Sequence, residues 1–324
     1  MHEITYREAI REALVEEMEK DPMVFLLGEN IAEGGGVYQV TKGILEKFGK
    51  DRIMDMPISE SGFVGAAVGA ALLGTRPVVD LMFSDFLPLA MDHLVNHAAK
   101  MRYMYGGKAR VPMVVRAFFG AGTTAGCSHS QSLEAWAIHC PGLKVVMPST
   151  PADAKGLLKT AIRDDDPVIF LEHRLLYAMR GRVPEGEYII PLGEADVKRE
   201  GRDVTVVAIG MMVHRAMEAA AELSKEGIEI EVLDPRSLLP LDCEALVRSI
   251  KKTGRILIAH EACKTGGIGG EIAAIAAKEA FGYLDAPIER VCAPDTPVPF
   301  SPPLERYYIP KKEDIVTAVR GMLS

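Results

Sequence analysis

The stretch PISESGFVGAAVGAALLG, residues 57–74, contains a single carboxylate, Glu60. We expect a strand that ends near Met56, the turn PISES and a helix that begins at about Ser61. Because open α/β sheets bind ligands at the carboxyl ends of their strands, this order predicts a binding role for Glu60. The alternative is a first-turn glutamate that the helix dipole favours.

The helix after Glu60 has a face made of very small residues. These are Gly62, Gly65, Ala66, Gly69 and Ala70. Such a face is too small to fill a core with side chains alone. We therefore expect something large to pack there, either the backbone of another helix or a flat ligand.

Around this stretch, short apolar runs alternate with helical patterns. The expected strands are VFLLGE (24–29), PVVDLMFSDF (77–86), VPMVVRAFFG (111–120), LKVVMPST (143–150) and PVIFLEH (167–173), and the expected helices between them include AMDHLVNHAAKM (90–101) and PADAKGLLKTAI (151–162). This alternation predicts a parallel, doubly wound α/β sheet. A second β/α series follows a stretch rich in Gly, Pro and charge, so we expect a domain over 1–180, a linker over 181–202 and a smaller domain over 203–324.

Composition and charge restrict the classes of function that the chain can have. Of the 324 residues, 48% are hydrophobic and 25% charged, which is typical of a globular protein. The net charge of −8, without a basic cluster, argues against a nucleic-acid or anionic-membrane partner. The five cysteines form no C-x-x-C pair, and the longest apolar run, 63–73, is far shorter than a membrane span. No signal peptide is evident, so we expect a soluble, cytoplasmic protein.

Two histidine patterns are candidates for chemistry. His129 follows a strand in the polar loop CSHSQS, where a histidine can transfer protons or can simply be solvated, and both interpretations stay open. His93 and His97 are four residues apart and share a helix face. They lack the glutamate of the zincin motif and any evident third ligand, so we expect no zinc there.

Two further motifs are ambiguous. The loop KTGGIGGE (264–271) lies between a strand and a helix, but its glycine spacing does not fit a dinucleotide-binding fingerprint and favours a tight turn or an anion nest. Three aspartates, residues 164–166, follow a helix end, where acids are unfavourable. We expect them to be solvated or bridged by a cation.

Several long motifs occur in register along nearly the whole chain. They include VFLLGEN, PISESGFVGAAVGAALLGTRPVVDLMFSDF, HSQSLEAW, PGLKVVMPSTPADAKGLLKTAIRDDDPVIFLEH and APDTPVPFSPPLERYYIP. In these motifs the chain resembles the beta subunit of the thiamine diphosphate-dependent first component of 2-oxo acid dehydrogenase complexes. The resemblance implies a transketolase-like α/β fold of two doubly wound domains, a pyrimidine-binding domain and a smaller C-terminal domain.

The resemblance also implies roles for particular residues. Glu60 matches the glutamate that hydrogen-bonds the aminopyrimidine nitrogen of the cofactor, and Phe86 matches the aromatic residue that packs on the pyrimidine ring. We expect Glu29 to bind the cofactor as well, although Asn30 stands where many relatives have a second acid. His129 matches the histidine that donates a proton while the acyl group passes to a lipoyl arm.

Metal sites follow from the same resemblance. Met113, Ala161, Asp164 and Asp166 align with positions that hold potassium, largely through backbone carbonyls. Related single-chain enzymes bind Mg²⁺ and the diphosphate through a G-D-G motif, which this sequence lacks. The resemblance therefore implies that an alpha subunit supplies the diphosphate half of the site, in an α₂β₂ heterotetramer.

The implied reaction is decarboxylation of pyruvate or a related small 2-oxo acid, with reductive acylation of a lipoyl group on an acyltransferase component. The segments MRYMYGGKA, HRLLYAM and DTPVPFS are most similar to beta subunits of acetoin dehydrogenases, which make the same acetyl-lipoyl product. Two remote alternatives are a nucleotide-binding oxidoreductase that uses KTGGIGGE and a non-catalytic scaffold. Neither explains Glu60, Phe86 and His129 together.

Overall fold

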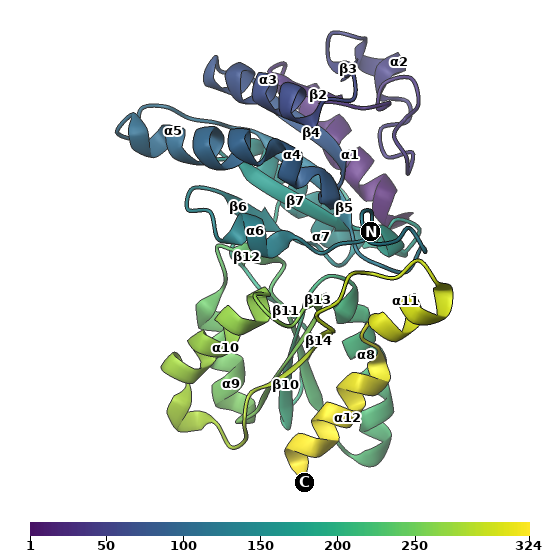
Figure 1. Ribbon diagram of the computed structural model, residues 1–324, viewed down its shortest axis with the longest axis vertical. Helices are drawn as coiled ribbons and strands as arrows, with labels where there is room; N and C mark the ends of the chain where they lie inside the picture. The colour runs from purple at the N-terminus through teal and green to yellow at the C-terminus, as the bar shows by residue number, and fades with distance from the viewer. The chain divides into compact units, whose positions relative to one another are not determined.

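The structure is a computed structural model that describes residues 1–324, and the chain divides into two compact units. The first contains Met1–Phe119 and Trp136–Leu192, and the second contains Gly120–Ala135 and Gly193–Ser324. Each unit is built around its own β-sheet, with helices packed against it (Figure 1).

The first unit contains a parallel sheet in the order β6-β7-β5-β4-β2-β3. Its strands are β2 (Val24–Gly28), β3 (Ile53–Asp55), β4 (Arg76–Phe83), β5 (Val114–Phe119), β6 (Lys144–Val146) and β7 (Val168–His173). Every residue of β5 and β7 is buried, as expected for central strands covered on both faces. The predicted doubly wound α/β fold is confirmed for this unit.

Helices cover this sheet. They are α1 (Tyr6–Lys20), α2 (Ile44–Phe48), α3 (Glu60–Leu72), α4 (Leu87–Met91), α5 (Ala99–Met104), α6 (Glu134–Ile138) and α7 (Pro151–Arg163), with short 3₁₀ turns η1 (Ser84–Phe86) and η3 (Arg174–Leu176). The helix α1 begins at a capping box between Thr5 and Glu8, and α7 begins after Thr150, whose hydroxyl accepts the Asp153 N–H. The helices α1 and α7 pack on each other, and α3 packs against α4.

The segment expected as one helix over 90–101 is helical but not uniform. Between α4 and α5 it contains a π-helix, η2 (Asp92–Ala98), in which the Ala99 N–H bonds the carbonyl of Leu94. Such wide turns are rare and are often found at functional sites. Apolar periodicity does not distinguish this turn from an α-helical one.

The second unit contains a sheet in the order β14-β13-β10-β11-β9. Its strands are β9 (Asp196–Arg199), β10 (Val204–Ala208), β11 (Ile230–Asp234), β13 (Ile256–Cys263) and β14 (Glu289–Ala293), and β12 (Ser237–Leu239) is a further short strand. Its helices are α8 (Met211–Leu223), α9 (Cys243–Thr253), α10 (Ile268–Glu279), α11 (Pro302–Tyr308) and α12 (Lys312–Leu323), with 3₁₀ turns η4 (Ser224–Glu226) and η5 (Phe281–Tyr283). Figure 1 shows α8 and α12 on one face of this sheet and α9 and α10 on the other.

The stretch expected to be a linker, 181–202, is not free of regular structure. Strand β8 (Arg180–Val183) pairs antiparallel with β1 (His2–Thr5), and β9 pairs antiparallel with β11. Both pairings join segments that are distant in sequence, so local composition does not reveal them. The boundaries of the two domains stay a prediction. No helix of the chain has the length and apolar character needed to cross a membrane.

Candidate functional site

Glu60 is the first residue of α3, which follows the carboxyl end of β3 after the turn 56–59. The predicted order of strand, turn and helix therefore holds to within one residue at each end. Glu60 is only 7% exposed, although first-turn acids that serve only the helix dipole are commonly solvated. Ser59, at the N-cap, makes no side-chain cap bond, so the amino end of α3 is not closed by its own residues.

Glu29 follows β2 in the same unit, and its charge interacts with that of Glu60. One carboxylate oxygen, Oε1, is buried and has no hydrogen-bond partner. Burial, and after it the negative charges of Glu60 and Asp80, raise the pKa of the Glu29 carboxyl. The next residue, Asn30, has a φ of 54°, a left-handed conformation that asparagine adopts more readily than most residues.

An aromatic cluster lies where β4 ends. The register of β4 against β5 shifts between Asp80 and Phe83, and Met82 has a φ of 64°. Bulges of this kind redirect side chains and are common beside active sites. Phe86, at the end of η1, meets Phe83 edge to face with ring centroids 5.7 Å apart, and is half-buried. Phe83 packs in turn against Phe118 at 4.4 Å.

A buried ionic network under this edge of the sheet was not predicted. Arg116 on β5 donates from Nε and Nη2 to Glu172 on β7, at 2.7 and 2.9 Å, and from Nη1 to Asp80 on β4 at 3.1 Å. The Tyr177 hydroxyl donates to Glu172 at 2.6 Å. Burial lowers the pKa of Arg116, but the charges of Glu172 and Asp80 more than offset this effect and raise it. The sequence signal is a charged residue inside an apolar run, in VVRAFF and VIFLEH.

This network is linked to the candidate site by a small pocket. Asp80 and Tyr177 line it together with Glu29 and Phe118. The charge of Asp80 also contributes to the raised pKa of Glu29. The network therefore fixes one wall of the space beside Glu29.

His129 belongs to the second unit, in the segment 120–135. Backbone amides of this loop are held by two buried acids. Ala121 donates to Glu261 at 2.7 Å, and Gly122 and Thr124 donate to Glu305. His129 itself is half-buried, with its Nδ1 3.1 Å from the Ser128 hydroxyl.

A ring from the C-terminal motif packs on the loop of His129. A Cβ added at Gly126, whose φ is 77°, would lie about 2 Å from the Phe300 ring, so only glycine fits there. Phe300 comes from the motif APDTPVPFS. The alternation of strands and helices did not point to it as a residue of this loop.

The three aspartates of the turn after α7, residues 164–166, are each paired with a basic side chain. Asp164 accepts from Lys144 Nζ at 2.7 Å, Asp165 pairs with Arg76 at 3.0 Å, and Asp166 pairs with Arg102.

The predicted potassium ligands can be compared with these contacts. The carbonyl oxygens of Met113 and Ala161 each accept one backbone N–H, from Val168 and Asp164. A carbonyl oxygen has two lone pairs, so these groups keep capacity for a cation, whereas the carboxylates of Asp164 and Asp166 are already neutralised.

The glycine loop after β13 is a tight connection. Gly266 has a φ of 72°, and a Cβ at Gly267 would lie 2.7 Å from the carbonyl oxygen of Cys263. Thr265 is held by Asp295 through its N–H and its hydroxyl. These contacts account for the glycines as a turn requirement.

The residues of the first unit fit a thiamine cofactor on the aminopyrimidine side. Glu60 is a buried carboxyl group, Glu29 has an unpaired buried oxygen, and Phe86 adds an aromatic surface. Acceptors beside an apolar wall suit a flat ring that carries N–H groups.

Comparisons with known proteins identify the family. The profile of the transketolase pyrimidine-binding domain matches residues 2–180, and that of the transketolase C-terminal domain matches 193–315. The chain is 53% identical over 322 residues to the beta subunit of acetoin:2,6-dichlorophenolindophenol oxidoreductase of Cupriavidus necator, covering 96% of this chain and 95% of the relative. It is 45% identical over 324 residues to the beta subunit of 2-oxoisovalerate dehydrogenase of Bacillus subtilis, covering 99% of both.

A solved structure described as a split-gene transketolase in an inactive β₄ tetramer has a TM-score of 0.81 and 27% identity, covering 99% of this chain and 98% of its own. These matches confirm the transketolase-like fold and the predicted resemblance. The chain belongs to the family of thiamine diphosphate-dependent dehydrogenase beta subunits that serves pyruvate, branched-chain 2-oxo acid and acetoin dehydrogenases.

Proposed function

We propose that this chain supplies the aminopyrimidine side of a shared thiamine diphosphate site, with Glu60 as the group that holds the proton. The observation that carries the proposal is the burial of Glu60, at 7% exposure, at the carboxyl edge of the sheet and beside a second acid. The helix dipole favours an acid in this first turn but does not require its burial. A buried carboxyl group is suited to hold a proton for a ring nitrogen.

Each residue of the candidate site has its own proposed role. When bound, thiamine diphosphate supplies the carbon nucleophile that the protein itself lacks. With the cofactor bound, Glu60 would hydrogen-bond the ring nitrogen and hold a proton there, and Phe86 would pack on the ring. Glu29 would offer its buried carboxylate oxygen to the same ring system, and His129 would serve as a proton donor during transfer to the lipoyl arm.

We propose that an alpha subunit completes the site in an α₂β₂ heterotetramer. The family works as a heteromeric enzyme, and this sequence contains no G-D-G motif to hold Mg²⁺ and the diphosphate. Mg²⁺ requires carboxylate and phosphate oxygens together, so we assign it to the alpha subunit. The further partner is a lipoyl-bearing acyltransferase, which accepts the acyl group.

We propose potassium as an additional ion at the turn after α7. The carbonyl oxygens of Met113 and Ala161 are the supporting groups, because each accepts one backbone N–H. The carbonyl oxygen of Asp164 accepts from Arg76 Nη1 at 2.9 Å, and the carboxylates of Asp164 and Asp166 act through the ion pairs that shape the turn. A stability measurement in KCl against tetramethylammonium chloride tests this. Unchanged stability would contradict the proposal.

The proposed substrate is pyruvate or a related small 2-oxo acid. The second candidate is acetoin, which the identities of 53% and 51% to two acetoin oxidoreductase beta subunits favour over the values of 45% to 48% for relatives that act on 2-oxo acids. The two reactions differ in the product that is not transferred, because a 2-oxo acid releases CO₂ whereas acetoin releases acetaldehyde.

The experiment uses the chain assembled with its alpha subunit, thiamine diphosphate, Mg²⁺ and 2,6-dichlorophenolindophenol as electron acceptor. Dye reduction with CO₂ release from pyruvate supports the first candidate. Dye reduction with acetaldehyde release from acetoin supports the second. Reduction with neither substrate, in a complex that binds the cofactor, would contradict both.

A further inference from the structure

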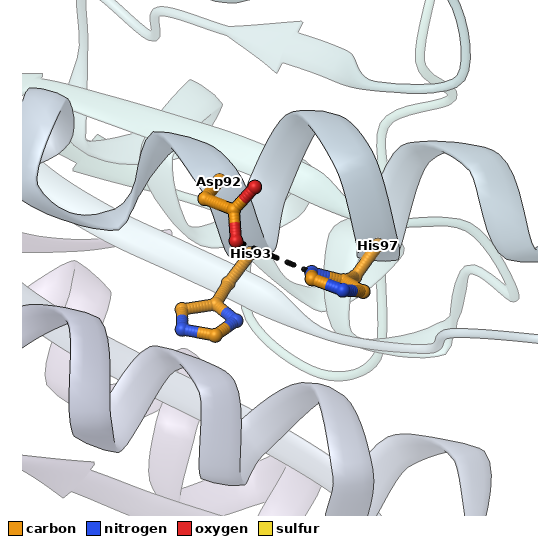
Figure 2. Close-up of side chains that lie close together, drawn as sticks. All are labelled: Asp92, His93 and His97. Atoms are coloured by element: carbon orange, nitrogen blue, oxygen red, sulfur yellow. Dashed lines mark ion pairs between the residues drawn. The ribbon is translucent and has the colours of Figure 1, made fainter.

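Three side chains with metal-binding groups meet on the π-helix η2. Asp92, His93 and His97 each offer one ligand atom, and these atoms lie within 4.8 Å of one another (Figure 2). We propose that they bind one divalent transition-metal ion, with Zn²⁺ as the reference ion. This proposal is independent of the thiamine chemistry assigned to Glu60.

The π-turn creates the third ligand. In an α-helix, residues five apart point about 140° away from each other, so Asp92 and His97 would face different directions. The wider turn, in which the Ala99 N–H bonds the Leu94 carbonyl, brings Asp92 Oδ2 to 3.9 Å from His97 Nδ1. The sequence expectation that no third ligand lies nearby assumed α-helical spacing, which this segment does not have.

Two of the three ligands are held by outer partners that leave one atom available. His93 Nε2 is 3.2 Å from the Ser61 hydroxyl, so its Nδ1 is the atom left on the side of His97 (Figure 2). Asp92 Oδ1 accepts from Asn96 Nδ2 at 2.7 Å, which leaves Oδ2 available. Outer partners of this kind orient the ligands of metal sites.

Of the three proposed ligands, His97 gives the clearest indication of a bound cation. His97 Nδ1 is buried and has no hydrogen-bond partner, which is rare for a ring nitrogen. The rings of His93 and His97 stack with centroids 5.4 Å apart, so one ring must rotate before both nitrogen lone pairs point at a single ion. A cation held by both imidazoles and Asp92 would give His97 Nδ1 a direct partner, which the Asp92 carboxylate at 3.9 Å does not.

The donor set selects the kind of ion. Two imidazoles and one carboxylate suit Zn²⁺ and similar transition metals, whereas Mg²⁺ and Ca²⁺ prefer oxygen ligands alone. Bonds of about 2.1 Å place two ligand atoms on one ion no more than about 4.2 Å apart, so closing the site requires small side-chain movements. The side chains of Asp92 and His97 are 66% and 43% exposed and can move in this way. Water would complete the coordination.

The test is calorimetric titration of Zn²⁺ into the untagged, metal-stripped full chain. We expect one equivalent per chain, and a Co²⁺-loaded sample should show the visible absorption of a low-coordinate N/O site. The substitutions His93→Gln, His97→Ser and Asp92→Asn should each weaken binding by about 100-fold. Asn96→Ala should weaken it by about tenfold, as loss of an outer partner does.

His139→Gln is the matched control, because His139 is exposed and lies outside the cluster. Circular dichroism establishes that each variant is folded. The proposal is overturned if the wild-type chain binds Zn²⁺ no more tightly than the His93→Gln/His97→Ser double variant. It is also overturned if His139→Gln removes binding while the cluster variants retain it.

Discussion

Glu60 and Glu29 are two acids that the fold places near each other in a partly dehydrated setting. Burial and the neighbouring charge of Glu60 raise the pKa of Glu29, so an ionised Glu29 costs stability in the folded chain. An acid kept at such a position argues for a chemical use, which the next two substitutions test.

Replacing Glu60 by Gln keeps the size of the side chain but removes its ability to take up a proton. In the enzyme assembled with its alpha subunit, we expect kcat to fall by at least about 100-fold, the usual scale of acid–base catalysis, with a melting temperature no lower than that of wild type. Glu46→Gln, an exposed acid on α2, is the control and should keep full activity. Activity within tenfold of wild type would instead favour a non-catalytic scaffold.

Glu29→Gln tests the raised pKa of that carboxyl. Because its pKa is higher in the folded chain than in the unfolded chain, the unfolded chain ionises first as pH rises, and the fold loses stability above the ordinary value of about 4.3. The glutamine variant lacks this loss. Its melting temperature should exceed that of wild type at neutral pH, with a difference that vanishes near pH 4. A lower melting temperature at neutral pH would show that the carboxylate stabilises the fold.

At the scale of elements, Arg116 connects the central strands β4, β5 and β7. Arg116 and Glu172 have side chains only 4% and 1% exposed, so removing the arginine leaves a buried carboxylate unpaired. We expect Arg116→Met to destabilise the first unit by about 3–5 kcal/mol in urea denaturation. Arg180→Met, which breaks the exposed pair with Glu3, should cost less than about 1 kcal/mol. Equal costs would refute the central role of Arg116.

The helix α3 provides a matched pair of glycines. A Cβ at Gly65 would lie 2.9 Å from His93 Cε1, whereas one at Gly69 meets nothing within 4 Å. We expect Gly69→Ala to stabilise the isolated chain by about 0.5–1 kcal/mol, whereas Gly65→Ala should not stabilise it, because the His93 ring must move to make room for the new Cβ. Thermal unfolding of the two variants measures both. A stabilising Gly65→Ala would show that α3 and η2 are not in close contact.

The elements with strong local signals are predictable from the sequence. The apolar runs of β5 and β7, the capped start of α7 and the turn before α3 were all predictable, because each depends on residues close together in the chain. The π-turn η2 was not, since an apolar pattern does not report a widened turn. Neither were the pairings of β8 and β9, which join distant segments.

The residues of the candidate site also divide into those that local sequence predicts and those that depend on distant segments. Glu60 is recognisable from its place between strand and helix, and Phe86 and His129 from long motifs in register. The network of Arg116, by contrast, depends on which strands become neighbours. That order is a property of the sheet and not of any one segment.

At the scale of the whole molecule, the chain is one subunit of a heteromeric enzyme and leaves surface for its partner. Gly62, Ala66 and Gly69 of α3 are exposed, and Leu73 just beyond them is 87% exposed. The isolated chain therefore covers only part of the small-residue face, through the contact of Gly65 with His93. The remainder is suited to the close approach of another subunit or of the cofactor.

The central claim is that this chain holds only the aminopyrimidine half of the site. The direct measurement is calorimetric titration of thiamine diphosphate with Mg²⁺ into the chain alone and into the chain assembled with its alpha subunit. We predict no detectable binding to the chain alone and tight, Mg²⁺-dependent binding to the assembly. Tight, Mg²⁺-dependent binding to the chain alone would contradict the account, because the chain would then complete the site by itself.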